Sequence, residues 1–213
     1  MPTKLDKREY RKISAPMETR KADDGQMVVE GYATTFNQPY ELMRDKDITV
    51  KEQVDPNAFA ETDMSDVIMQ YDHEGRVFAR IANGTLELNA DEHGLHIRAN
   101  LGGTEIGRQL FEEIEGGYTN KMSFGFTVAK DERTRTQDED GHITVLRTIT
   151  KVGKLYDVSA VSLPANDATE ISSRTIGDGL ITEALKEIQT EENRQRKIGE
   201  IRELLKGGKN HDD

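Results

Sequence analysis

Lys121-Met-Ser-Phe-Gly-Phe-Thr-Val128 alternates like a β-strand with two different faces, because side chains along a strand point to opposite sides with a period of two. The apolar face suits a core and carries Met122, Phe124, Phe126 and Val128. The other face carries Ser123, Gly125 and Thr127. Glycine leaves the Ser123 hydroxyl uncrowded on one side, next to open space, as a nucleophile on a rigid strand would be. Ordinary half-buried strands have the same pattern.

The bulk composition limits the possible function classes. The 213 residues suffice for one domain with a core and appended segments. The net charge of -11 argues against a general nucleic-acid binder, because phosphate binding needs a basic surface. The chain has no cysteine, which excludes disulfides, thiolate zinc sites and a cysteine nucleophile. We expect neither a cofactor nor a metal.

The hydropathy pattern gives no reason to expect a membrane protein. No run of about eighteen apolar residues exists, and the first ten residues are too polar for a secretory signal. We therefore expect an intracellular protein that does not bind a membrane. Hydrophobic residues make up only 34% and charged residues 32%, which predicts that part of the chain is extended or forms a solvated helix.

Short strand-like segments dominate the middle of the chain. Strands are expected over 27–36, 67–71, 78–81, 84–89, 95–101, 121–128, 143–151 and 155–163. The ranges 37–52 and 130–142 are charged and predict loops, and 1–26 predicts only one short strand. Helical spacing predicts a helix from Thr104 to Glu115 with Thr104 as its N-cap, and a short helix is expected over 58–61. These elements indicate a mainly β (α+β) fold with an antiparallel, barrel-like core of about seven strands.

Composition also divides the chain into three parts. Residues 1–26 form a polar N-terminal segment, 27–176 a folded domain, and 177–213 a helical and partly disordered C-terminal extension. Apolar residues recur at helical spacing from Ile181 onward, so 179–206 is predicted to form one or two helices that dock on a partner or stay solvated.

A serine nucleophile needs a base, and the base usually needs an orienting partner. His73 ends a hydrophobic strand in a tight polar turn, although a plain turn histidine would look the same. Asp157 is a lone carboxylate in an apolar strand, so it needs a partner that offsets its desolvation. An imidazole N–H would serve, and so would an ion pair with Lys151, Lys154 or an arginine.

Other chemistry has weaker support. His142 and His211 are expected to be solvated, and His93 with His96 lacks a third ligand for a metal. There is no phosphate-binding glycine loop and no Gly-x-Ser-x-Gly elbow. The order His73, Ser123, Asp157 differs from the orders of the chymotrypsin, subtilisin and α/β-hydrolase types, so a triad here would lie on another fold.

Eight short motifs follow one another over residues 27–175. They are Glu30-Gly-Tyr-Ala-Thr-Thr-Phe36, Val54-Asp-Pro-Asn-Ala-Phe59, Asp72-His73, Phe78-Ala-Arg80 with Gly84-Thr-Leu86, Asp91 to Leu95, Thr104 with Gly107, Met122-Ser-Phe-Gly-Phe126, and Asp157-Val-Ser-Ala-Val-Ser-Leu-Pro-Ala165. Each is weak alone, but the ordered set is specific. In this order the chain resembles the HK97-family prohead (capsid maturation) proteases of tailed phages and prophages, whose fold is akin to herpesvirus assemblins.

The resemblance implies roles for three residues: His73 as base, Ser123 as nucleophile and Asp157 as the acidic third member. Many family members carry Glu at that third position, and Pro-Asn-Ala-Phe replaces the more usual Pro-Gly-Ala-Phe. Oxyanion-hole donors are expected in the turn Pro164 to Asn166.

The resemblance also implies partners and a place of action. The substrate would be the scaffolding segment of the major capsid protein, cut inside the procapsid in the host (bacterial) cytoplasm. It further implies self-cleavage and a possible homodimer. No nucleic-acid or membrane partner is expected.

Two other function classes stay open at this stage. One is a catalytically silent capsid assembly or scaffolding module of the same fold. The other is a serine hydrolase that acts on small esters, which fits poorly with the absence of tryptophan and an aromatic content of 6%.

Overall fold

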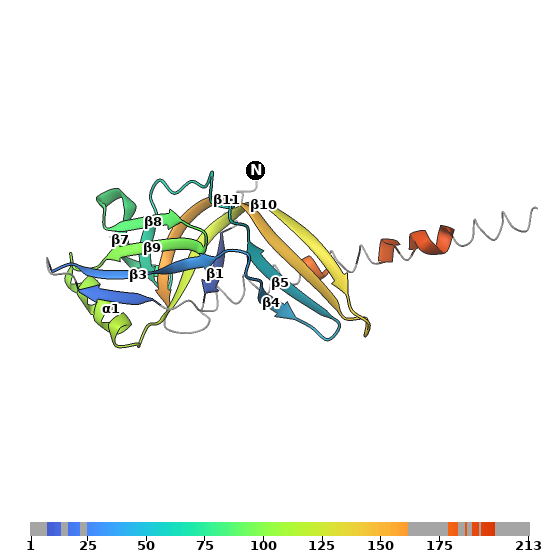
Figure 1. Cartoon of the computed structure of the whole chain (residues 1–213), viewed down its shortest axis with the longest axis horizontal. Helices are drawn as coiled ribbons and strands as arrows, with labels where there is room; N and C mark the ends of the chain where they lie inside the picture. The colour runs from blue at the N-terminus through green and yellow to red at the C-terminus, as the bar shows by residue number, and fades with distance from the viewer. Residues whose placement is uncertain are drawn as a thin grey trace, which may run out of the picture.

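Two β-sheets form the body of the molecule in the computed structural model (Figure 1). The structure describes residues 8–13, 17–21 and 25–161, and, within the C-terminal part, residues 179–182, 186, 189–191 and 193–198. Eleven strands and one α-helix lie in the described ranges up to residue 161. The prediction of a mainly β fold is therefore confirmed, with more strands than expected.

The smaller sheet has four strands, all paired antiparallel. Their order is β2 (Glu18–Lys21), β3 (Met27–Thr35), β9 (Gly94–Asn100) and β8 (Leu86–Ala90). The turn between β8 and β9 is fixed by Asp91, whose Oδ1 accepts hydrogen bonds from the backbone N–H groups of His93 and Gly94. The strands expected over 84–89 and 95–101 are thus present and form a hairpin.

The larger sheet has seven strands and is built around two long ones, β10 (Lys121–Gln137) and β11 (Ile143–Val161). The strand order is β1 (Glu9–Ile13), β10, β11, β5 (Ile48–Val54) and β4 (Tyr40–Arg44). The second half of β11 also pairs with β6 (Ile68–Tyr71), which forms a hairpin with β7 (Glu74–Arg80). The pairings of β11 with β5 and with β6 are parallel, whereas the other pairings of named strands are antiparallel, as expected for most of the core.

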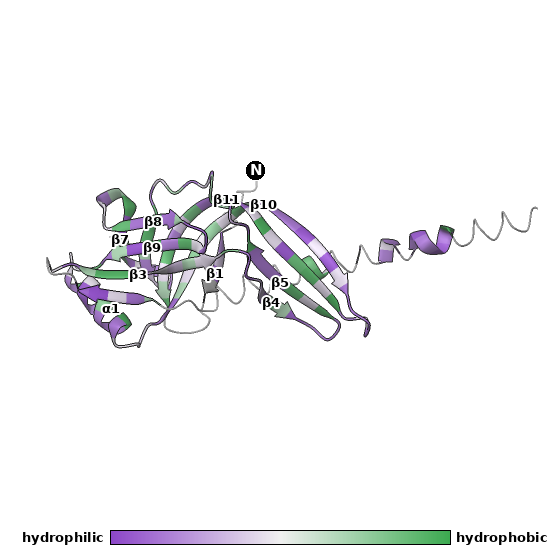
Figure 2. Ribbon diagram, in the orientation of Figure 1, coloured by the Kyte–Doolittle hydropathy of each residue, from purple (hydrophilic) through white to green (hydrophobic). Residues whose placement is uncertain are grey.

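Two predicted loops are strands in the structure. Residues 37–52 contain β4 and most of β5, and residues 130–137 extend β10. The side chains of 132–137 are exposed, so their charges face water while the backbone pairs with β11 (Figure 2). Strand pairing uses backbone groups, and a strand without an apolar face resembles a loop in sequence. The strands expected over 143–151 and 155–163 are one strand, β11.

The ladder between β10 and β11 is irregular in its middle. Its register shifts four times between Gly125 and Asp131, whereas the pairs on both sides of this stretch are regular. β-Bulges of this kind bend a strand and increase its twist. The half of the ladder that contains Ser123 and the outer half therefore lie on either side of a bend. We call β4, β5, residues 131–137 of β10 and residues 143–149 of β11 the arm.

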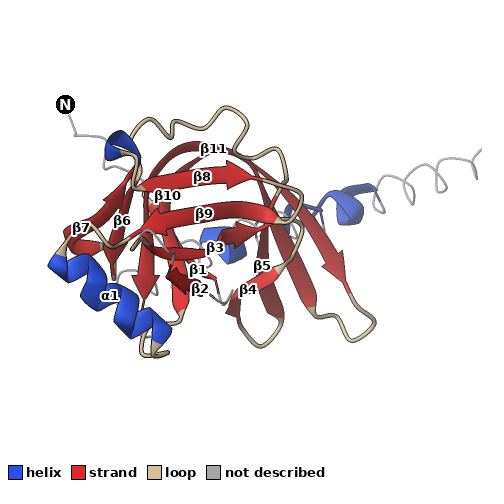
Figure 3. Cartoon of the chain, turned by 60° about the vertical axis from the view of Figure 1, so that its left-hand side comes forward, coloured by secondary structure: helices blue, strands red, loops and turns tan. Residues whose placement is uncertain are grey.

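The main core lies between the two sheets and under helix α1 (Glu105–Glu115). It contains Met122, Phe124 and Phe126 from the apolar face of β10, as the alternation predicted, and the two phenylalanine rings stack at 4.4 Å. The helix is also confirmed: Thr104 Oγ1 accepts from the backbone N–H of Gly107, and α1 lies beside β7 (Figure 3). The short helix expected over 58–61 is a series of turns instead.

A second, small core lies on the arm and receives a residue from the C-terminal part. Ile48, Val50, Ile143 and Val145 bury Leu180, whose exposed fraction is 4%. Residues 179–182 are helical, as are the described residues between 186 and 198. The predicted helices of 179–206 are thus present wherever that range is described, and their first turn docks on this chain itself.

The N-terminal segment contributes more than the single short strand expected. β1 pairs with β10, and β2 pairs with β3. The boundaries 27–176 and 177–213 stay predictions. Among the described residues, no helix has the length and apolar character needed to cross a membrane.

Candidate active site

The face of the large sheet opposite its core brings the three sequence-predicted residues together. On β10 and β11, Ser123 lies opposite Ser159 and Gly125 lies opposite Asp157. β6 runs parallel beside the same part of β11, and the turn after β6 carries His73. The segments that carry His73 and Ser123 thereby both lie beside the short stretch of β11 that carries Asp157.

The three side chains form a continuous hydrogen-bonded chain. His73 Nε2 lies 2.6 Å from Ser123 Oγ, and His73 Nδ1 lies 2.5 Å from Asp157 Oδ1. An ionised carboxylate only accepts hydrogen bonds, so the imidazole Nδ1–H donates to Asp157. The lone pair of Nε2 then faces the serine, and the Ser123 hydroxyl donates to it. This is the arrangement in which an imidazole can take the serine proton.

A tight turn with unusual backbone angles holds His73. Asp72 and His73 have φ values of 48° and 61°, in the left-handed region that most residues avoid. Two central residues with positive φ are typical of a two-residue hairpin turn of type I′, and Asp72 N–H donates to the carbonyl of Ala160 at 3.0 Å. Backbone strain of this sort costs about 1–3 kcal/mol per residue and gathers at functional sites.

Asp157 is buried, with an exposed fraction of 1%, and among the described residues its side chain is held by hydrogen bonds from His73 and Ser159. Ser159 Oγ donates to Asp157 Oδ1 at 3.0 Å, in addition to the imidazole. The two lysines considered as alternatives pair elsewhere: Lys151 with Glu61 and Lys154 with Asp63. Ser159 was not singled out from the sequence, although period-two spacing from Asp157 places it on the same face.

Gly125 has a role that differs from the expected one. A Cβ atom built at this position would lie 2.3 Å from Asp157 Oδ2 and 2.9 Å from Cε1 of Tyr10. The glycine therefore makes room for the aspartate and for a tyrosine of β1. Ser123 is only 1% exposed, so the open space expected next to its hydroxyl is absent and the three residues are enclosed.

Tyr10 is a further member of this group that the sequence gave no reason to choose. It lies opposite Gly125 on β10, and its ring centroid is 4.5 Å from that of His73, with the ring planes at 59°. Only the strand register brings Tyr10 here, and register cannot be read from an isolated polar segment.

A buried charged cluster lies under the opposite face of β1. Arg11 donates to both carboxylate oxygens of Glu52, Arg147 Nη1 donates to Glu52 Oε2 at 2.8 Å, and the Tyr40 hydroxyl donates to Glu52 Oε1 at 2.6 Å. Glu9 also accepts from both arginines. We call Glu9, Arg11, Tyr40, Glu52 and Arg147 the charged cluster.

The charged cluster shifts the pKa values of its members. Burial acts to raise the pKa of Glu52, but the charge and hydrogen bonds of Arg11, together with Arg147, lower it by more, so that it lies below its usual value. Burial acts to lower the pKa of Arg11, yet Glu52 raises it overall. Burial and the neighbouring Glu52 raise the pKa of Tyr40 well above its usual value. The ion pairs are therefore fully formed near neutral pH.

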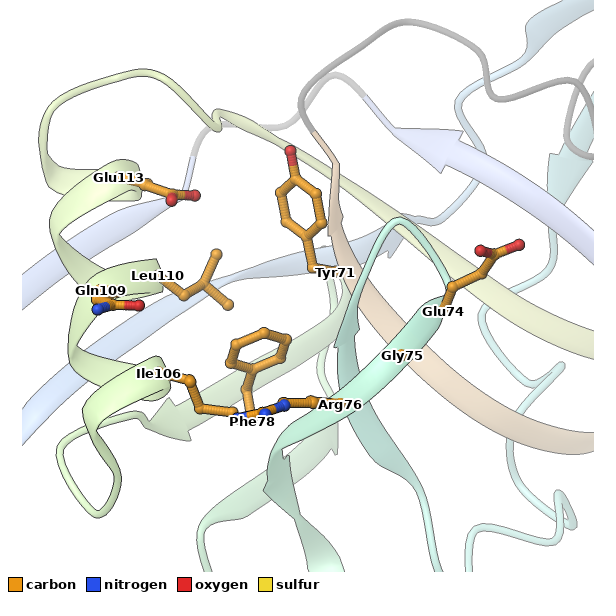
Figure 4. A pocket seen from close by; sticks show the side chains of 9 residues that line it. All are labelled: Tyr71, Glu74, Gly75, Arg76, Phe78, Ile106, Gln109, Leu110 and Glu113. Atoms are coloured by element: carbon orange, nitrogen blue, oxygen red, sulfur yellow. The ribbon is translucent and has the colours of Figure 1, made fainter.

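A groove of about 420 Å³ lies next to the His73 turn but not over the triad candidates (Figure 4). It separates β7 from α1, and Tyr71, Phe78, Ile106 and Leu110 line its apolar part. Tyr71 packs against the main core, which lies on the other face of the sheet from Ser123 and Asp157. The groove is thus separated from the serine by the sheet itself.

Three other histidines lie in the described part of the chain, and they take no part in this site. His142 Nε2 lies 2.8 Å from Thr49 Oγ1, so it is not simply solvated, and His93 and His96 pack around Tyr32. Within the described ranges, no three His, Asp or Glu side chains are grouped as a metal site would need. His211 and the turn Pro164 to Asn166, where oxyanion-hole donors were expected, fall outside the described residues.

The chain matches one family of known proteins. Residues 15–180 match the family model of the caudovirus prohead serine protease. Among solved structures, the capsid assembly protease gp21 of bacteriophage T4 is similar, with 12% sequence identity and a TM-score of 0.40 over 72% of this chain and 98% of that chain. No curated protein sequence matches significantly.

Proposed function

This chain belongs to the caudovirus prohead serine protease family, and from this premise we propose that it is a serine endopeptidase of phage head maturation, with Ser123, His73 and Asp157 as its catalytic triad. One observation carries the assignment: a single imidazole lies within hydrogen-bonding distance of a strand serine on one side and of a buried aspartate on the other. Family membership by itself does not identify which residues of this chain are catalytic.

In the proposed first step, His73 acts as the general base. Its Nε2 takes the proton of Ser123 as the serine Oγ bonds to the carbonyl carbon of the scissile peptide. Asp157 accepts the Nδ1–H and stabilises the imidazolium that forms. His73 then gives the proton to the leaving amine, the carbon–nitrogen bond breaks, and an acyl-enzyme remains.

In the second step, water replaces the amine. His73 Nε2 takes a proton from the water, the oxygen attacks the acyl carbon, and the Ser123 oxygen leaves with that proton. Donors to the developing oxyanion are required as well, because one such donor is worth about 10²–10³ in kcat. Since Ser123 is nearly fully covered, a substrate reaches it only after the covering atoms move.

The proposed substrate is the scaffolding segment of the major capsid protein, cut within the procapsid. Self-cleavage in the polar ends of the chain is part of the same proposal, because polar chain ends are common sites of proteolysis. The proposal rests on the family and needs a direct test with the protein's own capsid protein.

That test is co-expression of the chain with the neighbouring major capsid protein, read out by intact mass. We expect the wild type to shorten the capsid protein or itself, and the Ser123→Ala variant to leave every mass unchanged. Ser65→Ala is the matched control, because Ser65 lies in an exposed loop and its hydroxyl bonds only to nearby Asp63.

The masses also decide between the proposal and its rival. Cleavage by the wild type and by Ser65→Ala, but not by Ser123→Ala, supports the protease and identifies the cut site. Unchanged masses in all three, in cells that assemble capsids, would favour the silent assembly module.

A further inference from the structure

We propose that Tyr10 is a positioning residue for the triad: its ring covers the hydrogen bond between His73 and Asp157 and keeps the imidazole aligned with Ser123. This inference rests on the proposed function for its catalytic meaning. Its structural content, a shielded His73–Asp157 bond, can be tested without any activity.

Three groups meet above the bare backbone of Gly125. Tyr10 lies opposite this glycine on the β1 side, and Asp157 lies opposite it on the β11 side. The Tyr10 ring also contacts the ring of His73, with the centroids 4.5 Å apart. The phenol, the carboxylate and the imidazole thus form one packed group, in which the glycine provides the space for the other members.

The charged cluster holds the backbone of β1 in place, so the Tyr10 ring stays next to His73 and Asp157. Side chains alternate along a strand, so the neighbours of Tyr10 point to the other side, where Glu9 and Arg11 belong to the charged cluster. Arg11 is 2% exposed and Glu52 is 0% exposed. Withdrawing β1 would take Arg11 away from Glu52 and Glu9 away from Arg147, and the loss of partners at buried charges is unfavourable.

A second contact fixes the start of β1. The Arg8 guanidinium lies 3.8 Å from the centroid of the Tyr156 ring, and Tyr156 precedes Asp157 on β11. Contacts of this kind are attractive because the ring face is electronegative. Tyr10 therefore lies between two anchors, at Arg8 and at Arg11.

The covering ring has a direct chemical consequence. A hydrogen bond between an imidazole N–H and a carboxylate is stronger where water is excluded. Because the ring also packs against the imidazole, it limits the rotations that would turn Nε2 away from Ser123. Loss of alignment should lower the rate of the chemical step more than it weakens substrate binding, since misplaced groups lose reaction rate.

The experiment compares Tyr10→Ala and Tyr10→Phe with the wild type in full-length protein. The first readout is kcat and KM on a peptide spanning the identified cut site. The second is the low-field proton NMR signal of the His73 Nδ1–H, assigned by its loss in His73→Gln. For Tyr10→Ala we expect kcat to fall roughly ten- to a hundredfold with little change in KM, and the signal to disappear through exchange with water. Tyr10→Phe keeps the ring and should retain both.

Tyr32→Ala is the matched control, because it also removes a tyrosine ring that packs on histidines. The Tyr32 ring lies 4.6 Å from His93 and 5.2 Å from His96, on the smaller sheet. A general loss of packing would affect both alanine variants, whereas only Tyr10→Ala should alter the His73 signal.

A normal signal and normal kcat in Tyr10→Ala would overturn the proposal. If that variant fails to fold, Tyr10→Thr takes its place, because threonine suits a strand but has no ring to cover the His73–Asp157 bond, and a wild-type signal and kcat there would overturn the proposal. The NMR measurement is repeated with the Tyr10 variants in the Ser123→Ala background. If the wild type cleaves nothing, the proposed function fails, while the signal still reports whether Tyr10 shields His73.

Discussion

The hydrogen atom that serves as the side chain of Gly125 faces an aspartate oxygen on one side and a tyrosine ring on the other. This glycine is needed for space and not for backbone freedom, because its φ lies outside the left-handed region. Alanine is normally preferred to glycine within a strand by about 0.5–1 kcal/mol. At Gly125 the steric clash should reverse that preference.

We expect Gly125→Ala to destabilise the protein by about 1–3 kcal/mol, the usual cost of overpacking. The added methyl group must displace Asp157 or Tyr10, so peptide cleavage should fall steeply as well. Chemical denaturation and cleavage assays measure the two effects.

Gly103→Ala is the comparison for that substitution. A Cβ at Gly103 meets nothing within 4 Å, and its φ is also outside the left-handed region. This variant should keep both stability and activity. Equal behaviour of the two variants would contradict the spatial role of Gly125.

Single residues of the site differ in how well the sequence predicts them. His73, Ser123 and Asp157 can each be chosen because each departs from its own segment: a turn histidine, a hydroxyl facing away from an apolar face, and a carboxylate in an apolar strand. Tyr10 belongs to a polar segment without such a contrast. Its place depends on strand register, which long-range contacts decide.

Among the elements, β1 depends most on charge for its position. Arg11 and Glu9 connect it to β5 and β11 through the charged cluster. Removing one partner of a buried ion pair is far more costly than removing one at the surface, because the other charge stays desolvated. The cluster therefore decides whether the Tyr10 side of β1 is held in place.

Glu52→Gln should lower the free energy of unfolding at neutral pH by about 3–5 kcal/mol. It removes the negative charge that Arg11 and Arg147 share, and denaturant titration measures the loss. Glu41→Gln is the control, since Glu41 pairs with Arg44 at the surface, with exposed fractions of 43% and 59%, and its loss should change little.

The stability of the wild type and that of Glu52→Gln should depend differently on pH. Because the pKa of Glu52 in the folded protein lies below its usual value of 4.5, the carboxylate stabilises the fold fully above that value. This contribution is lost as the pH falls through the lower, folded-state pKa. Wild-type stability should therefore decline in acid more steeply than that of Glu52→Gln. Parallel stability curves between about pH 6 and pH 3 would contradict the role of Glu52.

Strands and helices with a clear apolar face could be predicted from the sequence, whereas those without such a face could not. α1, β3, β6 and β9 follow their hydropathy patterns. The outer part of β10 does not, because its side chains face water while its backbone pairs. The β4–β5 hairpin does not either, because its buried side chains are divided among the second core, the charged cluster and the main core. The parallel pairings of β11 also have no local sign, since they join segments about ninety residues apart.

At the scale of the whole molecule, both ends of the chain are tied to the β-sheets. β1 completes the edge of the larger sheet beside Ser123, and Leu180 fills the small core of the arm. The polar N-terminal segment, set apart on composition alone, thus contributes to the site. If the proposed self-cleavage occurs in the N-terminal segment and leaves an active enzyme, we accordingly expect the cut before Glu9.

Two N-terminal deletions test this requirement. Removal of 1–7 leaves β1 whole, and we expect normal cleavage activity. Removal of 1–13 exposes the edge of β10 and takes Arg11 away from Glu52, so the protein should lose activity and tend to aggregate. Activity and sedimentation measure the difference, and full activity after removal of 1–13 would refute the contribution of β1.

The docking of the C-terminal part can be tested at Leu180. Truncating a buried leucine costs about 2–5 kcal/mol, but Leu180 anchors a chain end, so the cost should appear as local release rather than global unfolding. We expect Leu180→Ala to speed amide hydrogen exchange at 179–182. Exposed Lys186, replaced by alanine, provides the comparison, and equal exchange in the two variants would argue against docking.

The irregular ladder between Gly125 and Asp131 gives the molecule a mechanical property. β10 and β11 extend from the part of the sheet that contains Ser123 into the arm, and at about 3.3 Å per residue the seventeen residues of β10 span roughly 55 Å. A continuous, regular ladder would transmit a force on the arm directly to Ser123. This ladder shifts register four times and so bends between the arm and Ser123, which means that it offers no straight path for a force from the arm to the hydrogen bond between Ser123 and His73.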